Sequence, residues 1–361
     1  MNDLTNDNDL PISWEPPTPQ ISLDDLLRRL IQDPALPSLQ ALVALSDLSR
    51  GDQARVREQW ALIPVPRRRE LIRTLVTEAE ENLDVQLGRL LRVALADEDE
   101  EVRRMAIEGL WEDTEPDLVI LFVQMLYNDA ESSVRMAAAR ALGLFILAGE
   151  LDELDASLAM RAEEALLTVL QSDHEPVSVQ AAALEGVAFS SEVGIRQLIE
   201  DAYYSHQLEM RVAALVAMGR SADVRWRTIV KAELQSPDPS MRAAAAQACG
   251  ELEIKSAARW LILLLEDDDL AVRIAAITAL GRIGGKEGQA ALRILADSEI
   301  PEEAAAADLA LEEMLFYAEG GNMALFDESE LDVADKADDL DDEADEWADE
   351  WDLWDDGEDD E

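Results

Sequence analysis

The sequence predicts an all-α protein, an α-solenoid of about nine stacked helix pairs with a disordered segment at each end. Three observations support this fold class. Hydrophobic residues make up 48% of the 361 positions but aromatic ones only 5%, and alanine and leucine, which favour helices, dominate. A short block recurs at a fixed interval, and the composition turns strongly acidic near the C-terminus.

Residues 1–20 are expected to form a disordered arm. They contain neither the basic stretch nor the apolar core of a secretory signal. No apolar run in the sequence approaches the roughly 20 residues of a membrane span. The single cysteine, Cys249, excludes an intrachain disulfide. These features predict a cytoplasmic protein. Cys249 lies in an alanine-rich helix, where we expect a small buried apolar side chain, with a reactive thiol as the alternative.

Residues 21–82 are predicted to form two divergent helix pairs, over residues 24–48 and 52–80. Four prolines, at positions 34, 37, 64 and 66, are expected to interrupt the helices. A solenoid needs terminal repeats with a polar outer face, and such repeats differ from the regular ones in sequence. The divergent sequence of this segment therefore indicates an N-terminal cap.

Residues 83–318 contain the repeat. A β-branched residue or methionine is followed by arginine (once by glutamine), then by alanines, and the block ends in Ala-Leu or a similar pair. Its second positions are 103, 135, 180, 211, 242, 273 and 304, separated by 32, 45, 31, 31, 31 and 31 residues. Such a period indicates stacked supersecondary units. Each unit resolves into two amphipathic helices that must bury their apolar faces against neighbouring units.

The step of 45 residues indicates an insertion. It falls around residues 148–156 and is predicted to be followed by a longer helix. Insertions in solenoids map to one face and can contribute to binding.

The repeat resembles a known family. The pattern Asp-x-x-x-x-Val-Arg-x-x-Ala-x-x-Ala-Leu-Gly is clearest at residues 267–281 and is followed with small changes at 129–143 and 237–250. It looks like HEAT repeats of the short, bacterial, PBS-lyase-like type, over about residues 83–316. The resemblance implies the fold. Phycobilin lyases use a similar repeat, so the resemblance also implies, as an alternative function, a chromophore lyase or another enzyme subunit. The same scaffold carries many unrelated functions.

The arginines of the repeat form a candidate ladder. Each follows an acidic or polar turn by about five residues. In one interpretation each arginine caps its turn or pairs with an aspartate of the adjacent repeat. In the other, the ladder lines a groove that accepts the carboxylates of a partner; arginine–carboxylate geometry permits both. The ladder comprises Arg103, Arg135, Arg211, Arg242 and Arg273.

Catalytic signatures are sparse, so we expect a non-enzymatic protein without a cofactor or metal. His174 and His206 are the only histidines, and both lie near predicted turns. The sequence offers no clustered metal-ligand motif, no local signature of a nucleophile with its base, and no phosphate-binding glycine loop with its lysine.

Residues 319–361 form the acidic tail. They carry 22 acidic residues against one lysine, so they contribute −21 to a net charge of −49 and leave −28 for the rest. Trp347, Trp351 and Trp354 would share one face of a helix with Leu340. We predict a segment that is disordered when free and that folds into a partner's groove. Alternatives are a merely solubilising tail, or docking on the chain's own solenoid with the arginine ladder as its receptor.

The predicted function is that of a protein–protein interaction scaffold or adaptor. The strongly negative charge disfavours direct binding to nucleic acid or to an anionic membrane. Protein partners, basic ones among them, are expected. A charge mimic or chaperone for a basic, nucleic-acid-binding client is the second hypothesis, and an enzyme or enzyme subunit is the third.

Overall fold

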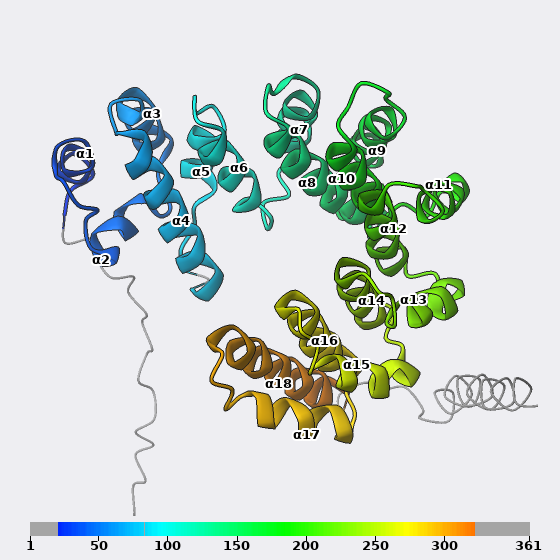
Figure 1. The fold of residues 1–361 in the computed structure, drawn as a ribbon. Coiled ribbons are helices and arrows are strands. Elements are labelled where there is room, and N and C mark those ends of the chain that lie inside the picture. Colours follow the sequence, from blue (N-terminus) through cyan, green and yellow to red (C-terminus); the bar gives the residue numbers. More distant parts are fainter. Residues whose placement is uncertain (1–20, 83, 322–361) are drawn as a thin grey trace, which may run out of the picture. The chain divides into compact units, whose positions relative to one another are not determined.

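The computed structural model describes residues 21–82 and 84–321, and within them all regular structure is helical. Eighteen α-helices and three short 3₁₀ helices succeed one another (Figure 1). The eighteen α-helices correspond in chain order to nine pairs, the number that the sequence predicts, and the all-α fold class is confirmed. The predicted N-terminal arm, residues 1–20, and residues 322–361 of the tail lie outside the described residues.

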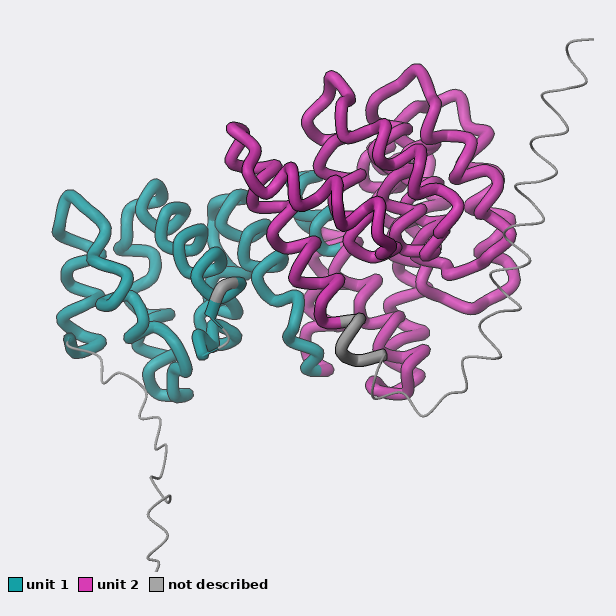
Figure 2. The backbone as a smooth tube through the Cα atoms, turned by 90° about the horizontal axis from the view of Figure 1, so that it is seen from below, with its two compact units in different colours: residues 1–115, 129–138 teal, residues 116–128, 139–361 magenta. Residues whose placement is uncertain are grey.

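The first of two compact units comprises residues 1–115 and 129–138 (Figure 2). Within it, α3 packs on α5 and α4 packs on α6, so the divergent pairs stack directly on the first regular pair. The cap boundary predicted at residue 82 therefore falls inside this unit. Its helices are α1 (Leu23–Gln32), α2 (Leu39–Leu42) with η1 (Val43–Leu45), α3 (Arg50–Trp60), α4 (Val65–Glu81), α5 (Gly88–Ala94) and α6 (Glu100–Glu108).

The four prolines among the described residues of this unit have two different roles. Pro34 and Pro37 lie in the connection between α1 and α2, where they interrupt the helical pattern as predicted. Pro64 is the N-cap residue of α4 and Pro66 is its second residue. The first turn of a helix accepts proline because its N–H groups have no intrahelical partner. Pro66 therefore helps to start a helix and does not interrupt one.

The second unit comprises residues 116–128 and 139–361, and α8 begins in the first unit and continues into this one. Its first helices are α7 (Pro116–Asn128), α9 (Ala156–Leu170), α11 (Val193–Tyr203), α13 (Arg227–Glu233), α15 (Ala258–Leu264) and α17 (Lys286–Leu295). Its second helices are α8 (Ser132–Glu150), α10 (Val177–Val187), α12 (Leu208–Arg220), α14 (Pro239–Glu251), α16 (Leu270–Ile283) and α18 (Pro301–Gly321). Short 3₁₀ turns, η2 (Val224–Trp226) and η3 (Lys255–Ala257), precede α13 and α15.

The second helices form a tightly packed layer, in which α10, α12, α14, α16 and α18 each pack on the next (Figure 1). The glycine that ends the Ala-Leu-Gly motif permits this close approach. A Cβ atom added at Gly219, Gly250 or Gly281 would lie only 2.9, 2.9 or 3.0 Å from the Cα atom of an alanine in the next second helix. Those alanines are Ala248, Ala279 and Ala310, so a glycine–alanine seam repeats every 31 residues, the interval read from the sequence.

The seam ends at α18. Glu312 lies 31 residues after Gly281, and Asp308 lies 31 residues after the buried Ile277. Both carboxylate side chains are exposed. Placing them against a further second helix would desolvate two charges at a position where the chain otherwise has glycine and isoleucine. The exposed face of α18 is mixed, because it also carries Leu309, Leu315 and Phe316, which are 67%, 57% and 75% exposed.

Helix α8 is the only helix in the described part of the chain that is long and apolar enough, by length and composition, to cross a membrane. Half of its apolar window is buried within the protein. Such burial is typical of a core helix in a stack of helices.

Candidate functional site

The ladder arginines bond the turn that precedes their own helix. Arg103, Arg135, Arg242 and Arg273 each donate from Nη1 to the backbone carbonyl oxygen six residues earlier, over 2.7–2.9 Å. Each of these arginines therefore provides a hydrogen bond to a backbone carbonyl group in the turn between the two helices of its repeat. At the corresponding position Gln180 donates to the carbonyl of Ser172.

Three ladder arginines also pair with an acid of the following repeat. Arg103 and Arg242 make bidentate bonds of 2.7–2.8 Å to Asp129 and Asp267. Arg273 donates over 2.6 Å to Glu303. Their side chains are only 14–19% exposed, and the partner carboxylates are still less so. The guanidinium of Arg242 in turn lowers the pKa of Asp267.

Arg211 differs from the other members of the ladder. Ser236 occupies the position that corresponds to Asp267, 31 residues earlier, and Arg211 forms no ion pair with the residues described here. The arginines thus form a series of separate links between repeats. Because most of them are engaged with carboxylates inside the fold, the geometry favours the interpretation in which they fix the stacking of repeats over one in which they receive a partner.

The first unit contains two further links of this kind that the sequence analysis missed. Arg68, only 2% exposed, lies 3.2 Å from Asp97 and 2.7 Å from Glu98. Asp97 also accepts a 2.5 Å hydrogen bond from the indole of Trp60. Arg69 makes two bonds to Asp99. The signal was the triple arginine after Pro66, near the start of α4.

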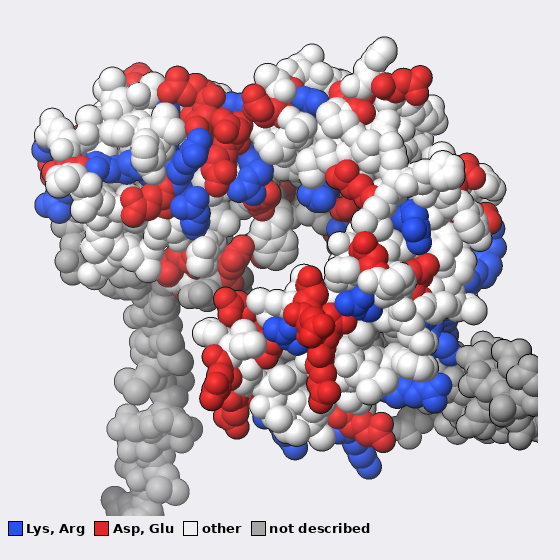
Figure 3. Space-filling model, in the orientation of Figure 1, with Lys and Arg blue, Asp and Glu red and all other residues white. Residues whose placement is uncertain are grey.

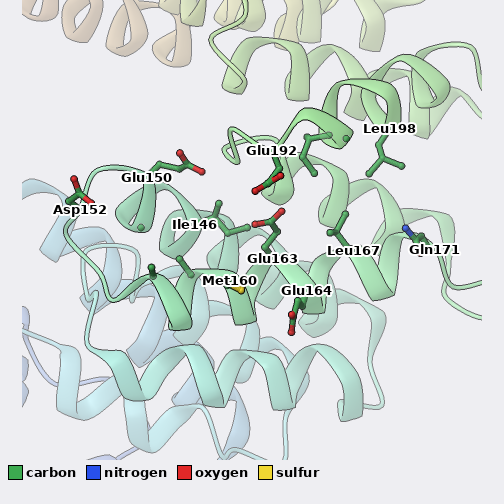
Figure 4. A pocket seen from close by; sticks show the side chains of 15 residues that line it. Ile146, Glu150, Asp152, Met160, Glu163, Glu164, Leu167, Gln171, Glu192 and Leu198 are labelled. Carbon is green, nitrogen blue, oxygen red and sulfur yellow. The ribbon is translucent and has the colours of Figure 1, made fainter.

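One concavity of the second unit is an open groove of about 810 Å³. Its walls are the end of α8, the length of α9 and the start of α11 (Figure 4). We call it the α9 groove. Its apolar lining is Ile146, Gly149, Ala156, Ala159, Met160, Leu167, Gly194, Ile195 and Leu198, and its polar lining is Glu150, Asp152, Glu163, Glu164, Gln171 and Glu192.

The polar lining of the α9 groove is almost entirely acidic. Five of its residues are carboxylates, and no lysine or arginine is among the lining residues. Glu163 and Glu192 point into the same space from opposite walls (Figure 4). Burial raises the pKa of Glu163, and the charges of Glu192, Glu150 and Glu164 act in the same direction, while a hydrogen bond with Ser190 opposes them. Elsewhere on the visible face, acidic and basic side chains lie beside one another (Figure 3).

The walls of the groove are held by bonds across the insertion. Glu150, at the end of α8, accepts hydrogen bonds of 3.0 and 3.1 Å from the backbone N–H and the hydroxyl of Ser191. Asp155 caps the start of α9. Gly194, the second residue of α11, has nothing within 4 Å of the place where a Cβ atom would stand. The groove is therefore a defined shape with free space at the α11 wall.

The sequence signal for this groove was the repeat step of 45 residues. The extra residues lengthen α8 to 19 residues, add the turn at 151–155, and give α9 its 15 residues, where α13 and α15 have seven each. The sequence located this irregularity. It did not identify the lining residues, because they come from three helices of different repeats.

The other candidates of the sequence analysis lie elsewhere. The tail residues Trp347, Trp351, Trp354 and Leu340 are outside the described residues. His174 and His206 are exposed, in the connections before α10 and α12. Within residues 21–82 and 84–321 no three histidine, cysteine or acidic side chains gather as a metal site would require. Cys249 is buried, which raises the pKa of its thiol to about 12. A thiol so rarely ionised is a poor nucleophile.

Comparison with known families identifies the repeats. The model of HEAT repeats matches residues 88–165 and 227–312, so these stretches are HEAT repeats, as the sequence motif predicts. The residues between them contain Gln180, which stands in place of the repeated arginine, and six of the fifteen lining residues of the α9 groove. None of the curated protein sequences matches the chain.

Solved structures of similar shape include proteins of differing function. Human deoxyhypusine hydroxylase is 17% identical, with 81% of this chain and 96% of that chain covered and a TM-score of 0.36. The CpcE–CpcF complex of phycocyanin lyase from Nostoc is 21% identical, with coverages of 63% and 94% and a TM-score of 0.41. YibA of E. coli is 16% identical, with coverages of 67% and 95% and a TM-score of 0.37. None of these likenesses bears on the activity of this chain.

Proposed function

We propose that the chain is a non-enzymatic interaction scaffold that binds a segment of another protein in the α9 groove. One observation carries the proposal: the repeats are regular except at the insertion, and the groove opens there, with apolar and charged side chains together on its walls. Protein interfaces combine an apolar centre with a polar rim in this way.

The shape of the groove supports binding of an extended surface. Met160 is 57% exposed on α9, and Leu151 and Val193, next to the lining residues, are also exposed. Exposed apolar side chains that gather in a concavity mark binding sites more often than do single ones on a flat surface. Of the three, Met160 lines the groove, and an interface here would cover it.

The acidic tail is proposed as a second, separate binding element. Its three tryptophans supply the kind of side chain that anchors interfaces, and its charge would steer it to a basic surface. The arginine ladder is a poor receptor for it within the same chain, because Arg103, Arg242 and Arg273 already bind carboxylates.

The charge of the chain favours a second candidate function, that of a mimic or chaperone for a basic, nucleic-acid-binding client. A charge of −28 before the tail and −21 within it would attract such a client over a long range. The two functions differ in their response to salt. Attraction of this kind falls steeply with ionic strength, whereas binding centred on the apolar part of the groove falls little.

The test compares proteins retained from a lysate of the cell that makes this chain. Gly194→Trp fills the groove from its open wall without meeting another atom of the fold at the Cβ position. Gly51→Trp is the matched control, because Gly51 is also the second residue of its helix and its Cβ position meets only Ser49 Oγ, at 3.7 Å. A third chain ends at Ala318 and lacks the tail.

We expect at least one protein to be retained by the native chain and by Gly51→Trp but lost with Gly194→Trp, and to lose less binding as salt is raised than proteins held by charge alone. Proteins lost on truncation belong to the tail. If Gly194→Trp retains every protein that Gly51→Trp retains, the groove is not the binding site and the proposed function fails.

A further inference from the structure

We infer that the occupant of the α9 groove is a basic amphipathic segment of a partner protein, with lysine or arginine side chains on either side of an apolar stripe. The inference rests on the proposed function and adds the chemistry of the partner. The charge of the lining, its apolar floor and its length each point to such a segment.

The charge of the groove selects a cationic occupant. Five carboxylates line it and no basic side chain does. The nearby Arg196 of α11 is paired with Asp223, the N-cap residue of η2, at 3.5 Å. An anionic segment would meet uncompensated repulsion here. The chain's own tail, at −21, is therefore not the occupant.

The apolar floor of the groove favours an occupant that has apolar side chains as well as positive charge. Ile146 and Ile195 are buried at the bottom of the groove, and Leu167 and Leu198 are half-buried on its walls. A purely polar cation would leave Leu167, Leu198 and Met160 in contact with water. An apolar stripe on the ligand covers them, while its basic side chains reach Glu163 and Glu192 on opposite walls (Figure 4).

The length of the groove sets the length of the segment. Its α9 wall runs from Ala156 to Gln171, which is about 22 Å at the rise of an α-helix. A bound helix of about 15 residues, or an extended segment of about seven, spans that distance. The carboxylates are spread along it, from Asp152 near one end to Glu164 beyond the middle, so the positive charges of the ligand should also be distributed.

The inference is tested by fluorescence anisotropy with the purified full chain and a labelled amphipathic helical peptide of leucine and lysine. Two further peptides serve as controls: the same composition with lysines spread around the helix, and the amphipathic pattern with glutamate in place of lysine. The double variant Glu163→Gln/Glu192→Gln removes two charges inside the groove. Glu266→Gln/Glu299→Gln removes two exposed charges outside it.

The native chain should bind the leucine–lysine peptide at least about tenfold more tightly than either control peptide. Glu163→Gln/Glu192→Gln should weaken that binding about tenfold, and Gly194→Trp should weaken it at least as much. Glu266→Gln/Glu299→Gln and Gly51→Trp should change it by less than about twofold. Equal loss with both double variants would show diffuse attraction by a net charge of −49 and would overturn the inference. Equal binding of the glutamate peptide, or undiminished binding by Gly194→Trp, would overturn it as well.

The two proposals fail separately. If Gly194→Trp loses a cellular protein but the leucine–lysine peptide does not bind in the groove, the scaffold function stands and the basic occupant is wrong. If the peptide binds in the groove but no cellular protein depends on Gly194, the groove accepts a basic amphipathic segment and the proposed scaffold function is wrong.

Discussion

The repeated arginines show how one side chain can serve two repeats. Arg242 bonds the carbonyl oxygens of Ser236 and Pro237 in its own turn and both carboxylate oxygens of Asp267 in the next. Its planar group presents donors in two directions, which lysine could not match. The two aspartates have different roles: Asp267 accepts the hydrogen bonds of Arg242, and Asp269 is the N-cap residue of α16. Residue spacing within one turn therefore sets both the helix start and the link between repeats.

Glu163 provides a residue-scale prediction about stability. Its pKa is raised above the ordinary value of 4.5 in the folded chain. The folded state thus favours the protonated form: this contribution to stability is complete below the ordinary pKa and is lost as pH rises through the raised value. At pH 7 the ionised carboxylate is a net cost. Glu163→Gln should therefore raise the melting temperature at pH 7, by no more than about 2 °C because the site is only partly buried.

The gain from Glu163→Gln should vanish below about pH 4, where the native side chain is protonated in both states. Thermal unfolding followed by circular dichroism across this pH range measures it. Glu164→Gln removes a charge from the exposed neighbour and should give a smaller change. A lower melting temperature for Glu163→Gln at pH 7 would mean that Glu163 is held by a favourable charge, contrary to the groove described here.

Cys249 gives a second prediction at this scale. The thiol is buried in α14, and its pKa is raised to about 12. It should not react with a disulfide reagent such as DTNB in the native protein and should react fully once the protein is unfolded in guanidinium. Rapid labelling under native conditions would favour the reactive thiol that the sequence left as an alternative.

At the scale of the element, the seam of small residues decides how closely second helices pack. Gly250→Ala places a methyl group 2.9 Å from the Cα atom of Ala279, a contact that only a backbone shift relieves. We expect a loss of about 1–3 kcal/mol in the free energy of unfolding, although alanine favours helix over glycine. Gly194→Ala enters open space and should stabilise the protein by about 0.5–1 kcal/mol. Urea unfolding of both variants measures the change in the free energy of unfolding. If both variants changed it in the same direction, close packing at Gly250 would not be what sets the stability of this seam.

The sequence predicted those elements whose pattern is local. The 31-residue interval and the two helices per repeat are carried by short local patterns in the chain, and the structure contains both. Helix α16 ends at Ile283, before two glycines. Gly284 and the next residue, Gly285, both have positive φ, a conformation that glycine adopts without strain. The α9 groove could be located only as an irregular step, because its walls are up to about 50 residues apart in the chain and meet through stacking. The buried Arg68–Asp97 pair was missed for the same reason.

At the scale of the whole molecule, the α9 groove and the acidic tail are proposed to be separate binding elements. Replacing Trp347, Trp351 and Trp354 with alanine should leave the melting temperature of the chain unchanged, because the described core is complete without them. It should abolish retention of those proteins that are also lost from the chain ending at Ala318. Retention of these proteins by the triple variant would show that the charge of the tail, and not its tryptophans, binds them.

Amide hydrogen exchange of the full chain, with and without a protein that the native chain retains and Gly194→Trp loses, tests the central claim most directly. The account predicts slower exchange on binding at the end of α8, along α9 and at the start of α11, over residues 146–171 and 192–198, which hold the lining of the groove. Exchange in α14 and α16 should be unchanged. Slower exchange confined to the ladder turns or to the tail, with residues 146–171 unaffected, would contradict it.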